Sequence, residues 1–177
     1  KETKPYKGIL YGQFMLCSDG PRLIEYNARF GDPEAMNVLP LLKTKMVDIC
    51  NSIVNEDLEN VEFIDKASVC KYIVPDGYPN TEYANTKVEV DEDKIKELGA
   101  NVFYAAVNQK DDGIYLSGSS ALGIVGQGET ISEAENVAEK ACQFVTGNIY
   151  KRRDVGTNEL VNKRVQHMND ILQKKKK

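Results

Sequence analysis

An alternation of polar and apolar side chains that ends in a Gly-Asp-Pro turn constrains the fold of this chain most. It occupies residues 21–34, PRLIEYNARFGDPE. Residues 23–30 are apolar and aromatic enough for a β-strand, in which successive side chains point to opposite faces. One face carries Glu25, Asn27 and Arg29, and the other carries Ile24, Tyr26, Ala28 and Phe30. The pattern therefore predicts a strand with one polar face and one face suited to a core.

The residues after this strand predict the start of a helix. Asp32 is expected to be the N-cap, Pro33 the first helical residue, and Glu34 a favourable charge in the first turn. A helix N-terminus beside the end of a strand offers partial positive charge to an anion.

The polar face combines side chains that suit a metal ion and a phosphate. The carboxylate of Glu25 and the amide oxygen of Asn27 are hard oxygen ligands of the kind that Mg²⁺ prefers. The planar guanidinium of Arg29 suits a phosphate or a transferring phosphoryl group. Residues at this spacing also occur on the solvated face of an edge strand, and the pattern alone leaves both interpretations open.

A second strand is predicted over residues 8–17, GILYGQFMLC, with a turn at residues 18–20. A three-residue hairpin loop would pair Cys17 with Pro21. Counting back from that pair places Gln13 opposite Glu25, on the same face. The expected result is a two-stranded platform that bears Gln13, Glu25, Asn27 and Arg29.

The segment IEYNARFGDPE, preceded by GILYGQFMLCSDGP and followed by VLPLL, resembles the glycinamide ribonucleotide synthetase (phosphoribosylamine–glycine ligase) family of ATP-grasp enzymes. The resemblance continues through residues 67–70, 77–79, 122–130 and 153–156 and covers most of the chain. It implies an α+β fold. The C-terminal part of an ATP-grasp domain, built of antiparallel strands and helices, is followed by a β-rich, barrel- or sandwich-like domain with a packed helix.

The resemblance also implies residue roles. Glu25 and Asn27 match the family's metal ligands, which hold the Mg²⁺ or Mn²⁺ that bridges the phosphates of ATP. Arg29 is the expected catalytic residue, which stabilises the transferred phosphoryl group, and Gly31 and Asp32 are expected to help bind substrate. Many ATP-grasp relatives carry a second carboxylate where this chain has Gln13, so two fully chelated metals are not expected here.

The implied reaction joins glycine to 5-phosphoribosylamine at the expense of ATP, through a glycyl phosphate, in purine biosynthesis. The expected domains are residues 1–57, the ATP-grasp part; 58–156, the β-rich domain; and 157–177, a basic helical tail. The family's N-terminal and ATP-lid domains are expected upstream of Lys1, so the chain alone is expected to be inactive. Another ATP-grasp ligase, a carboxylase subunit and a non-enzymatic binding module are the alternatives.

Apolar runs, cysteine spacing and charge indicate which class of protein the chain belongs to. No apolar run approaches the length of about 20 residues that a transmembrane helix needs. The four cysteines are scattered without metal-ligand spacing, which indicates reduced thiols in a cytoplasmic protein. Residues 151–177 carry nine Lys and Arg against three Asp and Glu. A nucleic-acid contact is the alternative there, but no aromatic residue follows Tyr150, and a solvated terminus is the favoured interpretation.

The remaining pattern predicts helices around a set of short strands. Residues 33–55 are expected to be helical with a break at Pro40. Strands are predicted at residues 67–74, 86–90, 102–107, 113–117 and 121–125, with a short helix over 91–98. The Gly-rich segment 117–128 lacks the Lys of a phosphate loop and is interpreted as turns between strands. A capping box at Thr130 and Glu133 begins a helix to Val145, and a last helix covers residues 157–173.

Overall fold

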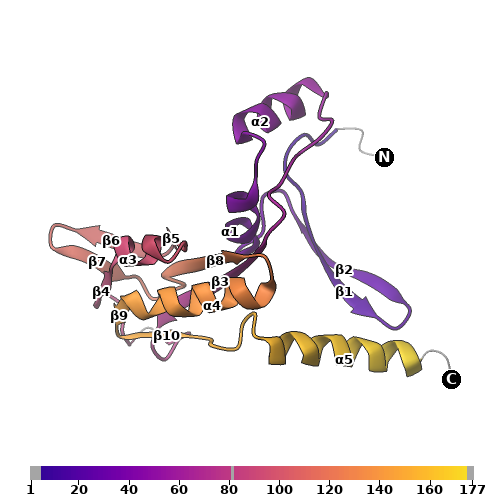
Figure 1. The fold of residues 1–177 in the computed structure, drawn as a ribbon. Coiled ribbons are helices and arrows are strands. Elements are labelled where there is room, and N and C mark those ends of the chain that lie inside the picture. Colours follow the sequence, from indigo (N-terminus) through magenta and orange to yellow (C-terminus); the bar gives the residue numbers. More distant parts are fainter. Residues whose placement is uncertain (1–4, 81, 175–177) are drawn as a thin grey trace. The chain divides into compact units, whose positions relative to one another are not determined.

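The computed structural model describes residues 5–80 and 82–174 (Figure 1). The chain forms two compact units, one from Lys1–Asp65 with Asn162–Lys177 and one from Lys66–Val161. Helices and antiparallel sheets are mixed in the α+β manner that the sequence predicted. No helix among the described residues is long and apolar enough to cross a bilayer.

The first unit begins with an antiparallel hairpin of β1 (Tyr11–Cys17) and β2 (Gly20–Asn27). Its turn has two residues rather than the predicted three, because Cys17 pairs with Gly20. A shift of register between Gln13 and Phe14 then compensates for the difference, so that Gln13 lies opposite Glu25 as predicted. The predicted register was therefore correct for Gln13 and Glu25 and wrong at the turn. The missing element was a β-bulge, which opposes two residues of one strand to one of the other.

Helices follow the hairpin, but not with the predicted cap. α1 (Glu34–Val38) has Pro33 at the N-cap and no side-chain cap hydrogen bond, so the assignment of Asp32 as N-cap was wrong. The break at Pro40 is confirmed, because it lies in the 3₁₀ turn η1 (Leu39–Leu41) that separates α1 from α2 (Met46–Asn55). In α2, Ile49 is buried.

The second unit contains two four-stranded antiparallel sheets (Figure 1). One has the order β10-β3-β8-β5 and consists of β3 (Ala67–Pro75), β5 (Asn101–Tyr104), β8 (Leu122–Gly128) and β10 (Ile149–Lys151). The other has the order β6-β7-β4-β9 and consists of β4 (Lys87–Val90), β6 (Val107–Lys110), β7 (Gly113–Leu116) and β9 (Val145–Gly147). Both sheets contribute to one apolar core, which includes Ile73, Leu122 and Ile124 from the first sheet and Val88, Leu116 and Val145 from the second.

α4 (Ile131–Ala141) packs against β3 and β8. The capping box is confirmed in part: Thr130 Oγ1 accepts from the Glu133 N–H at 3.2 Å, while Glu133 accepts from the Glu129 N–H at 2.9 Å. A Cβ added to Gly126 would lie 2.1 Å from the Ala134 carbonyl oxygen. Gly126 therefore lets α4 approach the central strand β8, and the interpretation of residues 117–128 as turns was wrong for residues 122–128, which form this strand.

The remaining elements differ from or complete the prediction. The predicted strand 102–107 is two strands, β5 and β6, and the strands β9 and β10 after α4 were not predicted. The short helix α3 (Glu92–Glu97) has Asp91 as its N-cap, and the 3₁₀ turn η2 (Cys142–Phe144) follows α4. The last helix is confirmed as α5 (Asn158–Lys174).

Candidate functional site

The polar face of the β1–β2 hairpin brings the two predicted metal ligands together. Glu25 and Asn27 lie two residues apart on β2, and Asn27 Nδ2 donates a hydrogen bond to Glu25 Oε1 at 2.9 Å. Gln13 lies directly across the ladder from Glu25. Strand alternation and the bulge thus place two oxygen-bearing side chains at one point, with a third opposite.

The spacing of this pair suits a divalent metal ion. Two neighbouring ligands of an octahedral ion with bonds of about 2.1 Å stand about 3.0 Å apart, close to the 2.9 Å between Glu25 Oε1 and Asn27 Nδ2. A half-turn of the Asn27 amide replaces its nitrogen by its oxygen at that point. Two protein ligands leave the other positions for water and phosphate oxygens, which is how Mg²⁺ is usually held.

Tyr11 and Glu34 extend this polar cluster, although the sequence analysis did not single out Tyr11. Its hydroxyl donates to Glu34 Oε1 at 2.9 Å, and Tyr11 lies across the ladder from Asn27. The hydrogen bond to Glu34, followed by burial and the negative charges of Glu34 and Glu25, raises the pKa of Tyr11, while Arg29 opposes the shift. The signal was present in the sequence, because Tyr11 precedes Gln13 by two and therefore shares its face.

The predicted catalytic and substrate-binding residues lie beyond the strand. β2 ends at Asn27, so Arg29 does not continue the strand face as predicted. Arg29 Nη1 donates to the carbonyl oxygen of Phe30 at 2.6 Å. A Cβ at Gly31 would lie 2.5 Å from Glu34 Oε2 and 2.8 Å from the Tyr11 ring. Gly31 thus allows Tyr11 and Glu34 to meet.

The helix after Asp32 offers little to an anion. α1 has only five residues, and Glu34 already places a negative charge in its first turn. The partial positive charge of a helix N-terminus depends on aligned peptide dipoles, which a single turn provides poorly. α1 is therefore too short to support the predicted contribution to anion binding.

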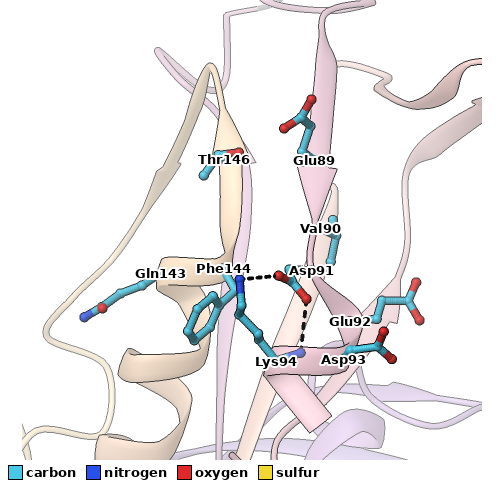
Figure 2. Close-up of a pocket in the computed structure, with 9 residues that line it drawn as sticks. All are labelled: Glu89, Val90, Asp91, Glu92, Asp93, Lys94, Gln143, Phe144 and Thr146. Atoms are coloured by element: carbon cyan, nitrogen blue, oxygen red, sulfur yellow. Dashed lines mark hydrogen bonds and ion pairs between the residues drawn. The ribbon is translucent and has the colours of Figure 1, made fainter. Parts of the chain in front are cut away.

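The second unit contains a separate acidic hollow of about 720 Å³ that the sequence analysis did not predict (Figure 2). Asp91 turns toward Lys94, whose Nζ lies 2.8 Å from Asp91 Oδ2. Figure 2 shows that the side chains of Glu89, Glu92 and Asp93 do not converge on one point. Within residues 5–80 and 82–174, no group of three or more His, Cys, Asp or Glu side chains is arranged to hold a metal ion.

Comparisons with known proteins identify the family of the chain. Residues 68–158 match the family model for the phosphoribosylglycinamide synthetase C domain, and residues 1–35 match the model for the ATP-grasp (A) domain of the same synthetase. The matched segments are therefore a C domain and, before it, part of an ATP-grasp domain. The chain belongs to the phosphoribosylglycinamide synthetase family.

Individual relatives are named phosphoribosylamine–glycine ligases. The chain is 69% identical over 172 residues to the phosphoribosylamine–glycine ligase of Methanobrevibacter smithii and 57% identical over 171 residues to that of Methanothermobacter thermautotrophicus. These alignments cover 97% of this chain and 39% of each relative. The chain also resembles the crystal structure of the phosphoribosylamine–glycine ligase from Thermotoga maritima, to which it is 28% identical in sequence. The structural match has a TM-score of 0.68 and covers 82% of this chain and 36% of that chain.

Proposed function

We propose that this chain is the C-terminal part of a phosphoribosylamine–glycine ligase, which joins glycine to 5-phosphoribosylamine with ATP and releases ADP and phosphate. Residues 1–57 complete an ATP-grasp domain, residues 58–156 form the β-rich C domain, and residues 157–177 form a basic helical tail. The observation that carries the proposal is the Glu25–Asn27 pair, 2.9 Å apart, on a strand that lies within the residues matched by the family's ATP-grasp model.

Glu25 and Asn27 would hold the divalent ion, Mg²⁺ or Mn²⁺, that accompanies ATP. When bound, such an ion neutralises negative charge on the phosphate oxygens as phosphoryl transfer proceeds. Arg29 provides a cation for the transferred phosphoryl group, because its hydrogen bond to the carbonyl oxygen of the next residue, Phe30, is exposed. Gly31 and Asp32 help to orient the substrate. Loss of one such preorganised charge typically costs about 10² in rate or more.

The chain covers only part of the length of its relatives, and this affects the activity expected of the chain alone. The chain spans 39% of the length of the curated relatives it matches, and residues 1–35 are the part that matches an ATP-grasp domain model. The N-terminal and ATP-lid domains of the longer protein are the partners that complete the active site. The chain alone therefore has no ligase activity and at best a weak affinity for Mg·ATP. The proposal includes a cytoplasmic location for the protein.

The test uses the full-length protein that contains this sequence. Glu25→Gln and Asn27→Ala should each lower glycine- and phosphoribosylamine-dependent phosphate release about 10²-fold. The matched control is Glu59→Gln, which changes an exposed carboxylate of the same unit, and it should retain full rate.

Unchanged turnover in Glu25→Gln would contradict the proposal that Glu25 binds the metal ion. Phosphate release that depends on bicarbonate rather than on glycine would instead identify a carboxylase, the alternative that shares the metal-binding strand.

A further inference from the structure

Three Asp–Gly pairs occur in the sequence, at residues 19–20, 76–77 and 112–113. In such a pair the main-chain nitrogen of the glycine can attack the side-chain carboxyl group of the aspartate, because glycine has no side chain to hinder the approach. All three aspartates are exposed, so exposure alone does not rank them. Their surroundings differ, however, and this difference ranks them.

The carboxylates of Asp19 and Asp112 are held by other side chains. Both carboxylate oxygens of Asp19 accept from the guanidinium of Arg22, with Arg22 Nε 3.4 Å from Oδ1. The Tyr115 hydroxyl donates to Asp112 Oδ2 at 2.8 Å, and Lys87 Nζ lies 4.0 Å from the same oxygen. The hydrogen bond from Tyr115 holds the pKa of Asp112 below its usual range. Such partners favour the ionised carboxylate, which must take up a proton before it can lose a hydroxyl group.

The glycines of these two pairs are also held in β-ladders. Gly20 is the first residue of β2 and pairs with Cys17, and Gly113 is the first residue of β7 and pairs with Lys110. A Cβ added at Gly113 would lie 2.5 Å from Lys87 Cε, so the side chain of Lys87 also crowds this glycine. Pairing restricts the rotation of the main chain that ring closure between aspartate and glycine requires.

Asp76 differs from the other two aspartates in both respects. Within residues 5–80 and 82–174, its side chain has no ion pair and no hydrogen bond to another side chain. Its Oδ1 instead accepts from the main-chain N–H of Gly77 at 3.0 Å. The carboxyl group therefore already lies beside the nitrogen that would attack it, and groups held about 3–3.5 Å apart are close to an attack geometry.

Gly77 lies outside every helix and strand of the described residues and has a φ of 74°. Apart from its two chain neighbours, no described residue would lie within 4 Å of a Cβ at this position. The attacking nitrogen is therefore neither crowded nor fixed in a ladder.

We propose that Asp76 is a site of spontaneous main-chain modification, at which aspartate converts to isoaspartate through a succinimide. The Gly77 nitrogen forms a bond to Asp76 Cγ, the bond from Cγ to a hydroxyl oxygen breaks, and the amide proton and the hydroxyl group leave as water. A water molecule then opens the ring. Opening at the side-chain carbonyl restores aspartate, whereas opening at the main-chain carbonyl leaves the chain running through Cγ and frees an α-carboxylate. The net reaction is an isomerisation that needs no reagent other than water.

Isoaspartate at this position would change the end of β3. The main chain gains one carbon atom within the turn that the Tyr78 N–H closes on the Pro75 carbonyl oxygen at 3.1 Å. The Asp76 N–H also donates to the Asn148 carbonyl oxygen at 3.0 Å, next to the start of β10. The modified protein should therefore exchange the amide hydrogens of Asp76 and Tyr78 faster than the original protein.

The test incubates the full-length protein that contains this sequence at physiological temperature and mildly acidic pH. Isoaspartate is followed by methyl transfer from a protein L-isoaspartyl methyltransferase, and it is located by peptide mapping with electron-transfer fragmentation. It should accumulate about tenfold faster at Asp76 than at Asp19 or Asp112, which is the retardation expected from one charge-assisted hydrogen bond. In urea, where the contacts of the folded protein are lost, the three pairs should react at similar rates.

Two variants test the cause of the difference. Tyr115→Phe removes the donor to Asp112 and should raise isoaspartate at Asp112 toward the level at Asp76. Gly77→Ala places a side chain beside the attacking nitrogen and should lower isoaspartate at Asp76 strongly. Gly99→Ala is the matched control, because Gly99 has a φ of 75° and equally open surroundings but follows a leucine. It should leave the rate at Asp76 unchanged, and far-UV circular dichroism checks that the variants fold.

Equal rates at the three pairs in the folded protein, or no isoaspartate at Asp76, would overturn the proposal. An excess at Asp76 that persists in urea would also overturn it, because local sequence and not the folded structure would then set the rate. An unchanged rate in Gly77→Ala would contradict attack by the Gly77 nitrogen. None of these measurements involves turnover, so their failure is distinguishable from failure of the ligase assignment.

Discussion

The β1–β2 hairpin and the β3–β8 pair are both antiparallel ladders, but they differ in what covers them. Every residue of β2 from Pro21 to Tyr26 is exposed. Phe14 and Tyr26 form an edge-to-face ring pair, yet they remain 50% and 56% exposed. In contrast, β8 is buried from Leu122 to Gly126 beneath α4.

The covered ladder is therefore expected to contribute mainly to stability, and the uncovered ladder mainly to function. A ladder between two packed layers contributes apolar burial to folding, whereas an isolated two-stranded hairpin is marginally stable in water. The candidate metal ligands lie on the uncovered ladder and the buried charge network on the covered one. Substitutions should therefore affect unfolding in the second unit and ligand binding in the first.

The largest effect is expected at Lys71. Lys71→Ala removes a buried ammonium and leaves Glu135 without its ion-pair partner. Breaking one side of a buried pair should lower the free energy of unfolding by about 3 kcal/mol or more, measured by urea denaturation. Lys7→Ala breaks an exposed pair with Glu56 in the first unit and should cost less than about 1 kcal/mol. Equal losses in the two variants would contradict the comparison.

A methyl group at Gly126 tests the packing of α4. Its Cβ would meet backbone atoms of Ala134 and Ala138 at 2.1 and 2.5 Å, so the helix must move. Gly126→Ala should lower the free energy of unfolding by about 2–3 kcal/mol. At Gly12 in the hairpin, the added Cβ would meet exposed rings of Phe14 and Tyr26, which can turn away. Gly12→Ala should therefore change the unfolding midpoint little, and a larger effect there would show that the hairpin is packed in solution.

The cap of α4 should have a smaller effect. Thr130→Ala removes the acceptor for the Glu133 N–H, which should lower the free energy of unfolding by about 1 kcal/mol. Thr130→Ser keeps the acceptor and is the control. If both variants unfold at the same urea concentration, this hydrogen bond does not contribute.

The pH dependence should come from Glu139. Because hydrogen bonds from Lys71 and Lys151 lower the pKa of Glu139 in the folded state below its value in the unfolded chain, its contribution is present above that unfolded value. The contribution is lost as the pH falls through the folded pKa. Between pH 6 and pH 3, Glu139→Gln should therefore lose less stability than the original protein, in parallel urea titrations. Parallel curves would show that Glu139 does not titrate with folding.

The smallest effect on stability is expected at the candidate metal site. Glu25→Gln changes an exposed carboxylate and should alter the free energy of unfolding by less than about 0.5 kcal/mol. A large loss of stability would mean that Glu25 has a structural role, and it would weaken the inference drawn from any loss of activity.

The sequence predicted the elements that local chemistry determines. Pro40 interrupts the helix because proline cannot continue it, and Thr130 begins α4 because its hydroxyl accepts an orphan N–H. The polar pair Glu25 and Asn27 followed from strand alternation, and the structure brings it together.

Features that depend on distant residues were not predicted. The bulge beside Gln13 has no local signal, and Lys71 lies in a strand pattern that an exposed lysine would also fit. Its burial depends on Glu135 and Glu139, four residues apart on α4 and therefore on one face. That spacing was visible in the sequence, but the pairing of α4 with β3 was not.

Manganese binding, followed by paramagnetic broadening of amide resonances with ATP present, tests the central claim most directly. Addition of Mn²⁺ should broaden the amide resonances of Gln13, Glu25 and Asn27, and Glu25→Gln should abolish that broadening while the β3–β8 resonances stay sharp. Broadening confined to the acidic hollow around Asp91, with the hairpin unaffected, would contradict the account.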